Sequence, residues 1–205
     1  MAADVETGSE KASPTLRERY RERTRWEIIN AYADLSLERG FNNFTMQDIA
    51  DRVGISHRTL YRYFESREAI TDGLNREIAA RVYTPGGDRF EDSAGVLRHN
   101  YRVFGEHRKP MLVCSLMVEA GLLSAPGRAS RDKYMRELVE DRGTNLNETG
   151  RRQLFGLLRI VAGSMAWARL TSESIGLTDD EAGAASEWAM AALVDAALKQ
   201  EGDFL

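Results

Sequence analysis

A short cationic and aromatic stretch carries the side chains best suited to chemistry with another molecule. Four of them share one face of a helix, at spacings i, i+1, i+4 and i+5: His57, Arg58, Tyr61 and Arg62. A guanidinium at Arg58 or Arg62 can donate a fork of hydrogen bonds to guanine O6 and N7. The hydroxyls of Tyr61 and Tyr63 can bind phosphate oxygens, and their rings can contact a thymine methyl group.

The charge of this stretch is opposite to that of the whole chain. The 205 residues carry a net charge of −4, whereas residues 52–67 hold four arginines against one glutamate. Residues 86–205 hold 15 Lys+Arg and 18 Asp+Glu, so most of the acid excess lies downstream. A local positive field can attract a DNA duplex even when the whole chain is acidic.

Neighbouring residues add polar groups of the same kind. Thr45 and Gln47 stand at the expected start of the preceding helix, where free backbone N–H groups favour an anion. Arg67 falls in the first turn of the following helix and is placed like a phosphate clamp. The predicted DNA contacts are Thr45, Gln47, Ser56, His57, Arg58, Thr59, Tyr61, Arg62, Tyr63 and Arg67. The alternative is that these side chains only solvate a small helix, and for His57 a base contact, a phosphate contact and plain surface all stay open.

The spacing around these residues predicts a helix-turn-helix over residues 46–63. Ala50 is small enough for two helices to cross closely, and Gly54 suits the backbone position with positive φ four residues later. Leu60 can fill the angle between the helices, with the rest of the core expected from Ile49, Val53 and Ile55. The side chains expected to cap these helices and the next one are Thr45, Ser56 and Ser66.

This part of the chain resembles the TetR family of transcriptional repressors. The resemblance covers roughly residues 20–80 and rests on Gly40-Phe41, Phe44-Thr45, Asp48-Ile49-Ala50, Val53-Gly54-Ile55-Ser56, Thr59-Leu60-Tyr61-Arg62-Tyr63-Phe64 and Ser66-Arg67-Glu68. It implies a three-helix DNA-binding head, a linking fourth helix and a ligand-binding body that dimerises. Carried over by position, the family's DNA contacts fall on Thr45, His57, Arg58, Thr59, Tyr61, Tyr63 and Arg67. Arg67 stands where the family usually has lysine, an exchange that keeps the charge but changes its geometry.

Composition and periodicity divide the chain into three parts. Residues 1–14 are small, polar and acidic, and they are expected to form a flexible arm. Residues 15–84 form the predicted helix-turn-helix DNA-binding domain with its linking helix, and Thr84-Pro85-Gly86-Gly87 marks its end. Residues 85–205 are predicted to form a larger helical domain that binds an effector and dimerises. Apolar residues recur at helical spacing throughout, so the predicted fold class is all-α.

Turn residues and helical periods also give helix positions. The first helix is predicted over 16–39 and stops at Gly40. Along it, residues at three- and four-residue steps are expected to share one face: Trp26, Ile29, Ala33 and Leu37. The fourth helix follows Ser66 and runs to about residue 83. The body helices are predicted over 89–107, 111–122, 127–141, 149–170 and 179–200, separated at Pro110, Pro126, Gly143 and Gly176.

Alternating charges open the first predicted helix. Arg17, Arg21 and Arg25 form one row along it. The pattern favours a solvated face with weak ion pairs, from Glu18 to Arg21 and from Glu22 to Arg25, over additional phosphate contacts.

The last two predicted helices are apolar on two sides. In the first, one side holds Leu154, Leu158, Val161 and Met165, with Leu157 and Trp167 elsewhere. The second has two stripes, Ala185, Trp188 and Ala192 beside Ala189, Leu193 and Ala196. A surface helix needs only one buried apolar stripe. The second apolar stripe of these helices is therefore predicted to pack against a second copy of the chain, which gives a two-fold homodimer through a four-helix bundle. The dimer would place two recognition helices in successive major grooves of a palindromic operator, about 34–36 Å apart. The alternative is a monomer with unusually buried terminal helices.

An effector pocket is predicted between the middle helices. Its candidate wall residues are Tyr101, Phe104, Met111, Met117, Phe155, Met165 and Trp167. Because methionine adapts to varied apolar ligands, the predicted effector is a small, largely apolar molecule that releases a repressor from double-stranded DNA. The alternative for each of these residues is a place in the core, as is expected for Cys114.

Residues and motifs that the sequence lacks argue against other classes of protein. A single cysteine allows no internal disulfide and fits a reducing cytoplasm. No run of about 18 apolar residues occurs, so no membrane partner is expected. His99 and His107 are eight residues apart, and no P-loop, Rossmann glycine pattern or Gly-x-Ser-x-Gly elbow occurs. We therefore expect no metal, no cofactor and no enzyme activity, and the competing interpretation is a helical interaction module that does not read DNA.

Overall fold

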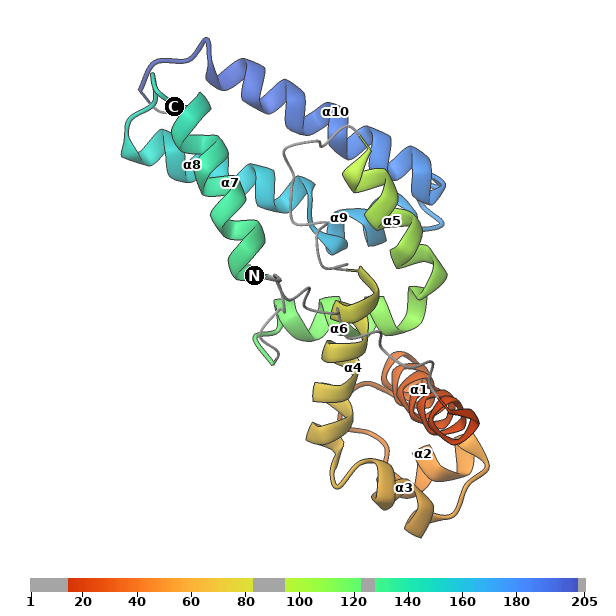
Figure 1. Cartoon of the computed structure of the whole chain (residues 1–205). Coiled ribbons are helices and arrows are strands. Elements are labelled where there is room, and N and C mark those ends of the chain that lie inside the picture. The colour runs from red at the N-terminus through yellow and green to blue at the C-terminus, as the bar shows by residue number, and fades with distance from the viewer. Residues whose placement is uncertain (1–14, 83–94, 123–127, 203–205) are drawn as a thin grey trace, which may run out of the picture.

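Two groups of helices, stacked one above the other, make up the part of the chain that the computed structural model describes, residues 15–82, 95–122 and 128–202 (Figure 1). The head consists of α1 (Leu16–Arg39), α2 (Met46–Val53), α3 (His57–Tyr63) and α4 (Arg67–Val82). The body consists of α5 (Val96–Glu106), α6 (Arg108–Glu119), α7 (Arg128–Arg142), α8 (Glu148–Val161), α9 (Ser164–Leu170) and α10 (Asp179–Ala197). These described residues contain no strand, which confirms the all-α prediction. The predicted arm at 1–14 and the predicted boundary after residue 84 lie outside them.

Local capping sets the ends of the head helices where the sequence predicts them. Thr45 begins α2 with a reciprocal capping box, because its hydroxyl accepts from the Asp48 N–H and the Asp48 carboxylate accepts from the Thr45 N–H. Hydrogen bonds from the hydroxyl and backbone of Thr45 lower the pKa of Asp48 to about 2. α2 ends at Gly54, whose left-handed backbone (φ 77°, ψ 32°) lets its N–H and the following one return to Ala50.

α1 is covered by two groups of helices, which widens its buried face beyond the predicted stripe. It packs against α2 and α4 in the head and against α6 in the body. Ile29 and Ala33 of the predicted face are buried, whereas Leu37 of the same face is 41% exposed. Other buried positions on α1 are Ile28, Ala31, Tyr32, Leu35 and Ser36. A single periodic stripe underestimates the buried face of a helix that two layers cover.

The head and the body share one hydrophobic core where α1 and α4 meet α6. Buried side chains run continuously from the head helices into α5, α6 and α9. The Tyr32 hydroxyl donates to Met117 Sδ at 3.9 Å and accepts from the Thr71 hydroxyl at 3.2 Å. At the surface of this joint, Lys109 pairs with Asp34 at 2.7 Å. These contacts tie α6 to both α1 and α4.

The prediction of one helix over 149–170 is wrong, because the chain breaks there into α8 and α9. Gly163 has an extended backbone (φ −79°, ψ 156°) and precedes α9 without a side-chain cap. The Tyr101 hydroxyl lies 3.1 Å and 3.2 Å from the carbonyl oxygens of Val161 and Gly163, and 3.2 Å from the Ser186 hydroxyl. Burial raises the pKa of Tyr101 to about 12. A neutral phenol on α5 therefore contacts both sides of the break: the Val161 carbonyl at the end of α8, and the Gly163 carbonyl, which also accepts from the N–H groups of Ala166 and Trp167 in α9.

Two further packings complete the body. α5 lies along α10 (Figure 1), and a Cβ at Gly183 would come within 2.5 Å of the Arg98 Cα, so this close approach requires glycine. A second, smaller core joins α7, α8 and the end of α10: Met135, Val139, Leu146, Leu154, Leu158 and Ala197. Pro110, predicted to lie between two helices, instead stands in the first turn of α6, where its missing N–H has no helical partner to lose.

Candidate nucleic-acid interface and effector cavity

The second helix of the helix-turn-helix, α3, exposes the face that the sequence predicts to contact DNA. Leu60 is fully buried and Phe64 is 2% exposed, so they hold the inner side of α3 in the head core. Thr59 and Tyr63 are half-buried beside the exposed positions, which are His57, Arg58, Tyr61 and Arg62. α3 lies at the end of the head remote from the body (Figure 1), so this face is open to a large partner.

The exposed face of α3 is cationic and aromatic. The rings of His57 and Tyr61 meet edge to face, with their centres 4.7 Å apart. The Arg62 guanidinium carbon lies 5.7 Å from the centre of the Tyr63 ring. Within the described ranges, neither Arg58 nor Arg62 is paired with an acid. Both guanidinium groups can therefore donate to acceptors on another molecule.

Other residues that the sequence predicts to contact DNA already form hydrogen bonds within the head. The Ser56 hydroxyl accepts from the Thr59 N–H at 3.1 Å and lies 2.8 Å from the Thr59 hydroxyl. Gln47 donates to Asp51 at 2.7 Å along α2, and the Thr45 hydroxyl belongs to the capping box. A DNA contact by Thr45, Ser56 or Thr59 would have to share a hydroxyl with a helix cap, whereas Gln47 keeps a second amide N–H and its carbonyl oxygen for another partner.

Arg67, the predicted phosphate clamp, faces the turn between α1 and α2. Its Nη1 donates to the Phe41 carbonyl at 2.7 Å, and its Nη2 donates to the Phe44 carbonyl. Its guanidinium carbon also lies 4.5 Å from the centre of the Phe44 ring. The arginine fork thus fastens the start of α4 to the 41–44 turn, and a phosphate contact would have to use its remaining N–H groups. A lysine could not make both carbonyl contacts in this planar arrangement.

The positive charge open to a partner is smaller than the count of arginines in 52–67 indicates. Arg52 donates two hydrogen bonds to Glu38, at 2.9 Å and 2.7 Å. With Arg67 turned toward the 41–44 carbonyls, Arg58 and Arg62 are the arginines of this segment that face solvent without an acidic partner in the described ranges.

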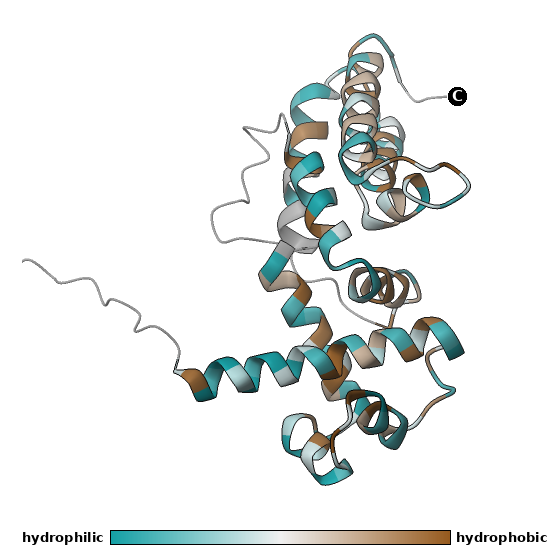
Figure 2. Cartoon of the chain, turned by 90° about the vertical axis from the view of Figure 1, so that its right-hand side faces the viewer, coloured by the Kyte–Doolittle hydropathy of each residue, from teal (hydrophilic) through white to brown (hydrophobic). Residues whose placement is uncertain are grey.

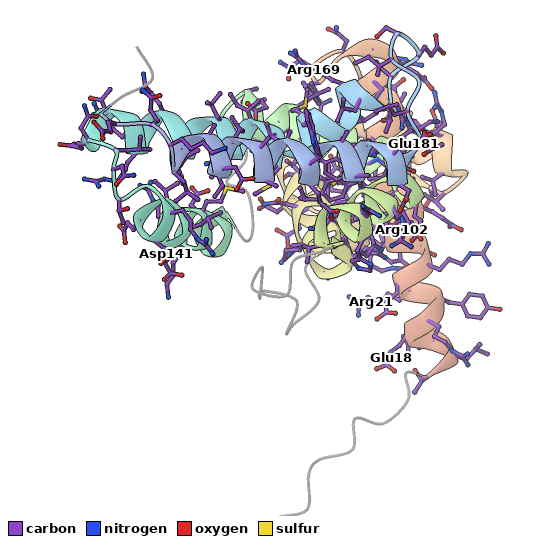
Figure 3. The ribbon with its side chains drawn as sticks, turned by 90° about the horizontal axis from the view of Figure 1, so that it is seen from above. Glu18, Arg21, Arg102, Asp141, Arg169 and Glu181 are labelled. Atoms are coloured by element: carbon purple, nitrogen blue, oxygen red, sulfur yellow. The ribbon has the colours of Figure 1, made fainter. Side chains whose placement is uncertain are left out.

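The basic row of α1 extends beyond the head. Figure 2 shows the first turns of α1 reaching away from the other helices, and Figure 3 labels Glu18 and Arg21 on this extension. The predicted pairs are not those that form: Glu18 caps the start of the helix, and Arg25 lies 3.7 Å from Glu77 of α4. The pair between Arg25 and Glu77 joins two helices, so the spacing of charges within one helix could not predict it.

A cavity of about 800 Å³ lies between α6, α7, α8 and α9. Apolar side chains in its wall are Val118, Met135, Phe155, Ile160 and Met165. Charged side chains in its wall are Glu119, Asp132, Arg159 and Arg169. The wall also includes Gly163 and Ser164 at the break between α8 and α9. This volume lies within the range of roughly 300–1,000 Å³ that small-molecule sites occupy.

The head matches a known family. A family model described as "Bacterial regulatory proteins, tetR family" matches residues 28–74, which run from within α1 through α2 and α3 into α4. This region of the chain, residues 28–74, is therefore similar to the tetR family. The match contains the exposed face of α3, the capped turn before it and the Arg67 contacts, so the family's region and the candidate interface coincide.

Curated relatives match the same tetR-family region. The HTH-type transcriptional regulator TcmR of Streptomyces glaucescens is 33% identical over 72 residues, which cover 34% of this chain and 32% of the relative. The HTH-type transcriptional repressor KstR2 of Rhodococcus jostii (strain RHA1) is 40% identical over 52 residues, or 25% of this chain and 26% of the relative. These matches span about a third or less of the relatives' length.

A solved structure resembles the fold of most of this chain. The crystal structure of a TetR-family transcriptional regulator from Syntrophomonas wolfei aligns with 85% of this chain and 96% of its own, with a TM-score of 0.56 and 16% identity. At this identity the likeness concerns the fold alone, and it extends to the helical body. Within the described residues, no helix is long and apolar enough to cross a membrane, and no group of His, Cys, Asp and Glu side chains is arranged to hold a metal.

The cavity of the body takes in only part of the predicted pocket. Phe155 and Met165 line it. The other five predicted residues are packed in the core, each at most 6% exposed: Tyr101, Phe104, Met111, Met117 and Trp167. Trp167 donates from Nε1 to Asp179 at 2.7 Å and meets the Phe104 ring edge-on. For these five, the structure agrees with the alternative of a place in the core.

The charged part of the cavity wall is not among the residues that the sequence predicts to line a pocket. Arg159 on α8 pairs with Asp132 on α7 at 3.1 Å, and both side chains are partly buried. A weak signal existed, because Arg159 is the one charged residue in the apolar second half of α8, residues 154–161. Nothing local connects it with Asp132, which is 27 residues earlier in the chain.

Proposed function

We propose that this protein is a DNA-binding transcriptional regulator that binds a palindromic operator as a homodimer and is released by a small effector held in the body. The exposed face of α3 carries this proposal. Leu60 and Phe64 lock the helix in place, while Arg58, Tyr61 and Arg62 face solvent at the far end of the head. An α-helix fits the major groove, and these side chains offer donors for guanine edges and phosphates.

Exposed apolar side chains on α8 and α10 support a homodimer. Trp188 is 74% exposed and Ile160 is 70% exposed, and Leu157 is also exposed. The opposite sides of these helices are buried within the protomer at Leu154 and Leu158 of α8 and at the start and end of α10. Covering the exposed sides with a second copy would remove large apolar groups from water, which favours association.

A contact path from the cavity to the head supports release by an effector. Ser164, in the cavity wall, accepts a hydrogen bond from Ser115 of α6 at 2.8 Å. From α6, Met117 contacts the Tyr32 hydroxyl of α1, which in turn accepts from Thr71 of α4. An effector that prefers one position of α6 would bias the angle of the head. A hundredfold loss of DNA affinity requires a differential binding energy of roughly 2.7 kcal/mol between the two conformations.

In vitro selection of duplexes from a random pool tests the proposal. We expect the bound sequences to converge on two inverted half-sites whose centres are separated by about one helical turn, or by a whole multiple of it, because two α3 helices must enter the grooves on one side of the duplex. Analytical ultracentrifugation of the protein with the selected duplex measures the stoichiometry. A pool that stays random after repeated rounds would refute the DNA-binding part, and a single half-site would refute the dimer.

The affinity for the selected duplex should fall steeply with salt. Lysine and arginine contacts to phosphates release condensed counterions, so four or more such contacts per dimer give a slope of log affinity against log salt steeper than about −3. Fluorescence anisotropy of a labelled duplex in roughly 50–200 mM salt measures this slope. A flat dependence would contradict the role of Arg58, Arg62 and their neighbours as phosphate contacts.

A further inference from the structure

Arg159 is a charged residue of the cavity wall, and it forms an ion pair that joins two helices. It extends from α8, and its Nη1 lies 3.1 Å from both carboxylate oxygens of Asp132 on α7. The Arg159 side chain is 35% exposed and the Asp132 side chain 22% exposed, so both are partly withdrawn from water. Glu119 and Arg169 of the same wall are more exposed. An ion pair in this setting is held more firmly than one on the open surface.

The pair uses only part of the hydrogen-bonding capacity of Arg159. A guanidinium carries five N–H donors, and among the described residues only Nη1 has a partner. The Nε and Nη2 donors form a planar fork, which matches the two oxygens of a carboxylate. The oxygens of Asp132, in contrast, are both already engaged by Nη1. The unused hydrogen-bonding groups beside the cavity are therefore the N–H donors of Arg159, and they suit a negatively charged acceptor.

The rest of the wall suits an apolar molecule. Val118, Met135 and Phe155 line the cavity from three different helices, and Ile160 and Met165 add further apolar surface. We infer that the effector is an amphipathic carboxylate, whose charged end binds the free fork of Arg159 while its apolar part lies against this wall. The inference rests on the effector role proposed above, and it replaces a largely apolar effector with one that carries a negative charge.

Three ligands that share a ten-carbon chain test the charge: decanoate, decanamide and decyltrimethylammonium, all below their micelle-forming concentrations. Isothermal titration calorimetry on the full-length protein without DNA measures each dissociation constant. We expect decanoate to bind at least tenfold more tightly than decanamide, and the cation to bind more weakly than either. Equal binding of decanoate and decanamide, preference for the cation, or no binding of decanoate at millimolar concentration would overturn the inference.

Variants locate the charged contact. Arg159→Gln should reduce the preference for decanoate over decanamide to less than twofold while decanamide binding stays the same. Asp132→Asn should raise decanoate affinity severalfold, because it removes the carboxylate that competes for Arg159. Arg152→Gln is the matched control, since Arg152 lies on the same helix, outside the cavity wall, and should keep the full preference. An unchanged preference in Arg159→Gln would overturn the assignment.

Two further measurements keep the result interpretable. If Arg159→Gln alone unfolds, the double variant with Asp132→Asn leaves no unpaired charge and gives the same test. Addition of decanoate to the protein bound to its selected duplex then measures release. Binding through Arg159 without release would count against the proposed effector-controlled function and leave the carboxylate site standing. Release by all three ligands alike would support effector control and refute the carboxylate site.

Discussion

Replacing Arg58 and Tyr61 together by alanine is expected to weaken binding to the selected duplex by at least about a hundredfold. Both side chains are exposed on α3, and neither contributes to the head core. A good base contact contributes about 1–3 kcal/mol, and a dimer loses each contact twice. Electrophoretic mobility shift or fluorescence anisotropy at fixed salt measures the loss, and thermal unfolding should be nearly unchanged.

The control for this double variant is Arg102→Ala in the body. Arg102 is exposed on α5 and lies 3.7 Å from Asp180, a surface pair that contributes little to stability. The substitution removes one positive charge per protomer on α5 in the body, whereas α3 lies at the far end of the head (Figure 1), so it reports the general effect of charge on DNA affinity. If the double variant binds the selected duplex as tightly as the unchanged protein, the surface that we assign to DNA is wrong. The head would then fit a helical interaction module that does not read DNA.

Trp167→Ala is expected to lower the free energy of unfolding by about 3–5 kcal/mol, the usual cost of removing a large aromatic side chain from a core. Trp167 has no exposed surface, and its Nε1 donates to Asp179 at the start of α10. The Phe104 ring contacts it edge-on, and the Arg108 guanidinium carbon lies 5.2 Å from its ring centre. For a chain of this size the loss corresponds to a fall in Tm of roughly 6–20 °C. Chemical denaturation followed by circular dichroism measures it.

Trp188→Ala provides the matched comparison for this prediction. The same change at a side chain that is 74% exposed creates no cavity inside the protomer. Its effect should therefore appear only through weaker self-association, as a Tm that depends on protein concentration. A loss below about 1 kcal/mol for Trp167→Ala would contradict the packing described around α9.

The head could be predicted from sequence because its signals are local. Thr45 and Asp48 form their capping box within four consecutive residues, and Gly54 adopts the left-handed conformation that the turn requires. Leu60 is buried by the geometry of the same motif. Such features depend on backbone conformation and on neighbours a few residues away, so the order of residue types is enough to place them.

The features that the sequence missed depend on contacts between distant segments. Leu37 shares the predicted apolar face with Ile29 and Ala33, yet it is 41% exposed, and α1 packs against helices of both the head and the body. Arg67 fits the general position of a phosphate contact, yet carbonyl groups 23 and 26 residues earlier receive its hydrogen bonds. The break at Gly163 is stabilised by a hydroxyl 62 residues earlier. Periodicity describes one helix at a time and carries no information about such partners.

The lack of information about distant partners also explains why only two of the predicted pocket residues line the cavity. Aromatic and methionine residues at helical spacing fill a core as well as they line a cavity, and only the packing of neighbouring helices decides between the two. Phe155 faces the cavity, whereas Trp167 a few turns later is sealed by Phe104 and Asp179. Arg159 was overlooked because its partner Asp132 lies on another helix.

The shared core between α1 and α6 has a consequence for protein engineering. A chimera that joins this head to the body of a relative would cut through the side chains that bury Tyr32 and would separate Lys109 from Asp34. The new body would have to supply a helix with the shape and polarity of α6, or the grafted head would expose apolar surface and lose its orientation. For the DNA-binding function proposed for α3, sequence preference is therefore better exchanged by transplanting the exposed residues of α3 than by exchanging whole heads.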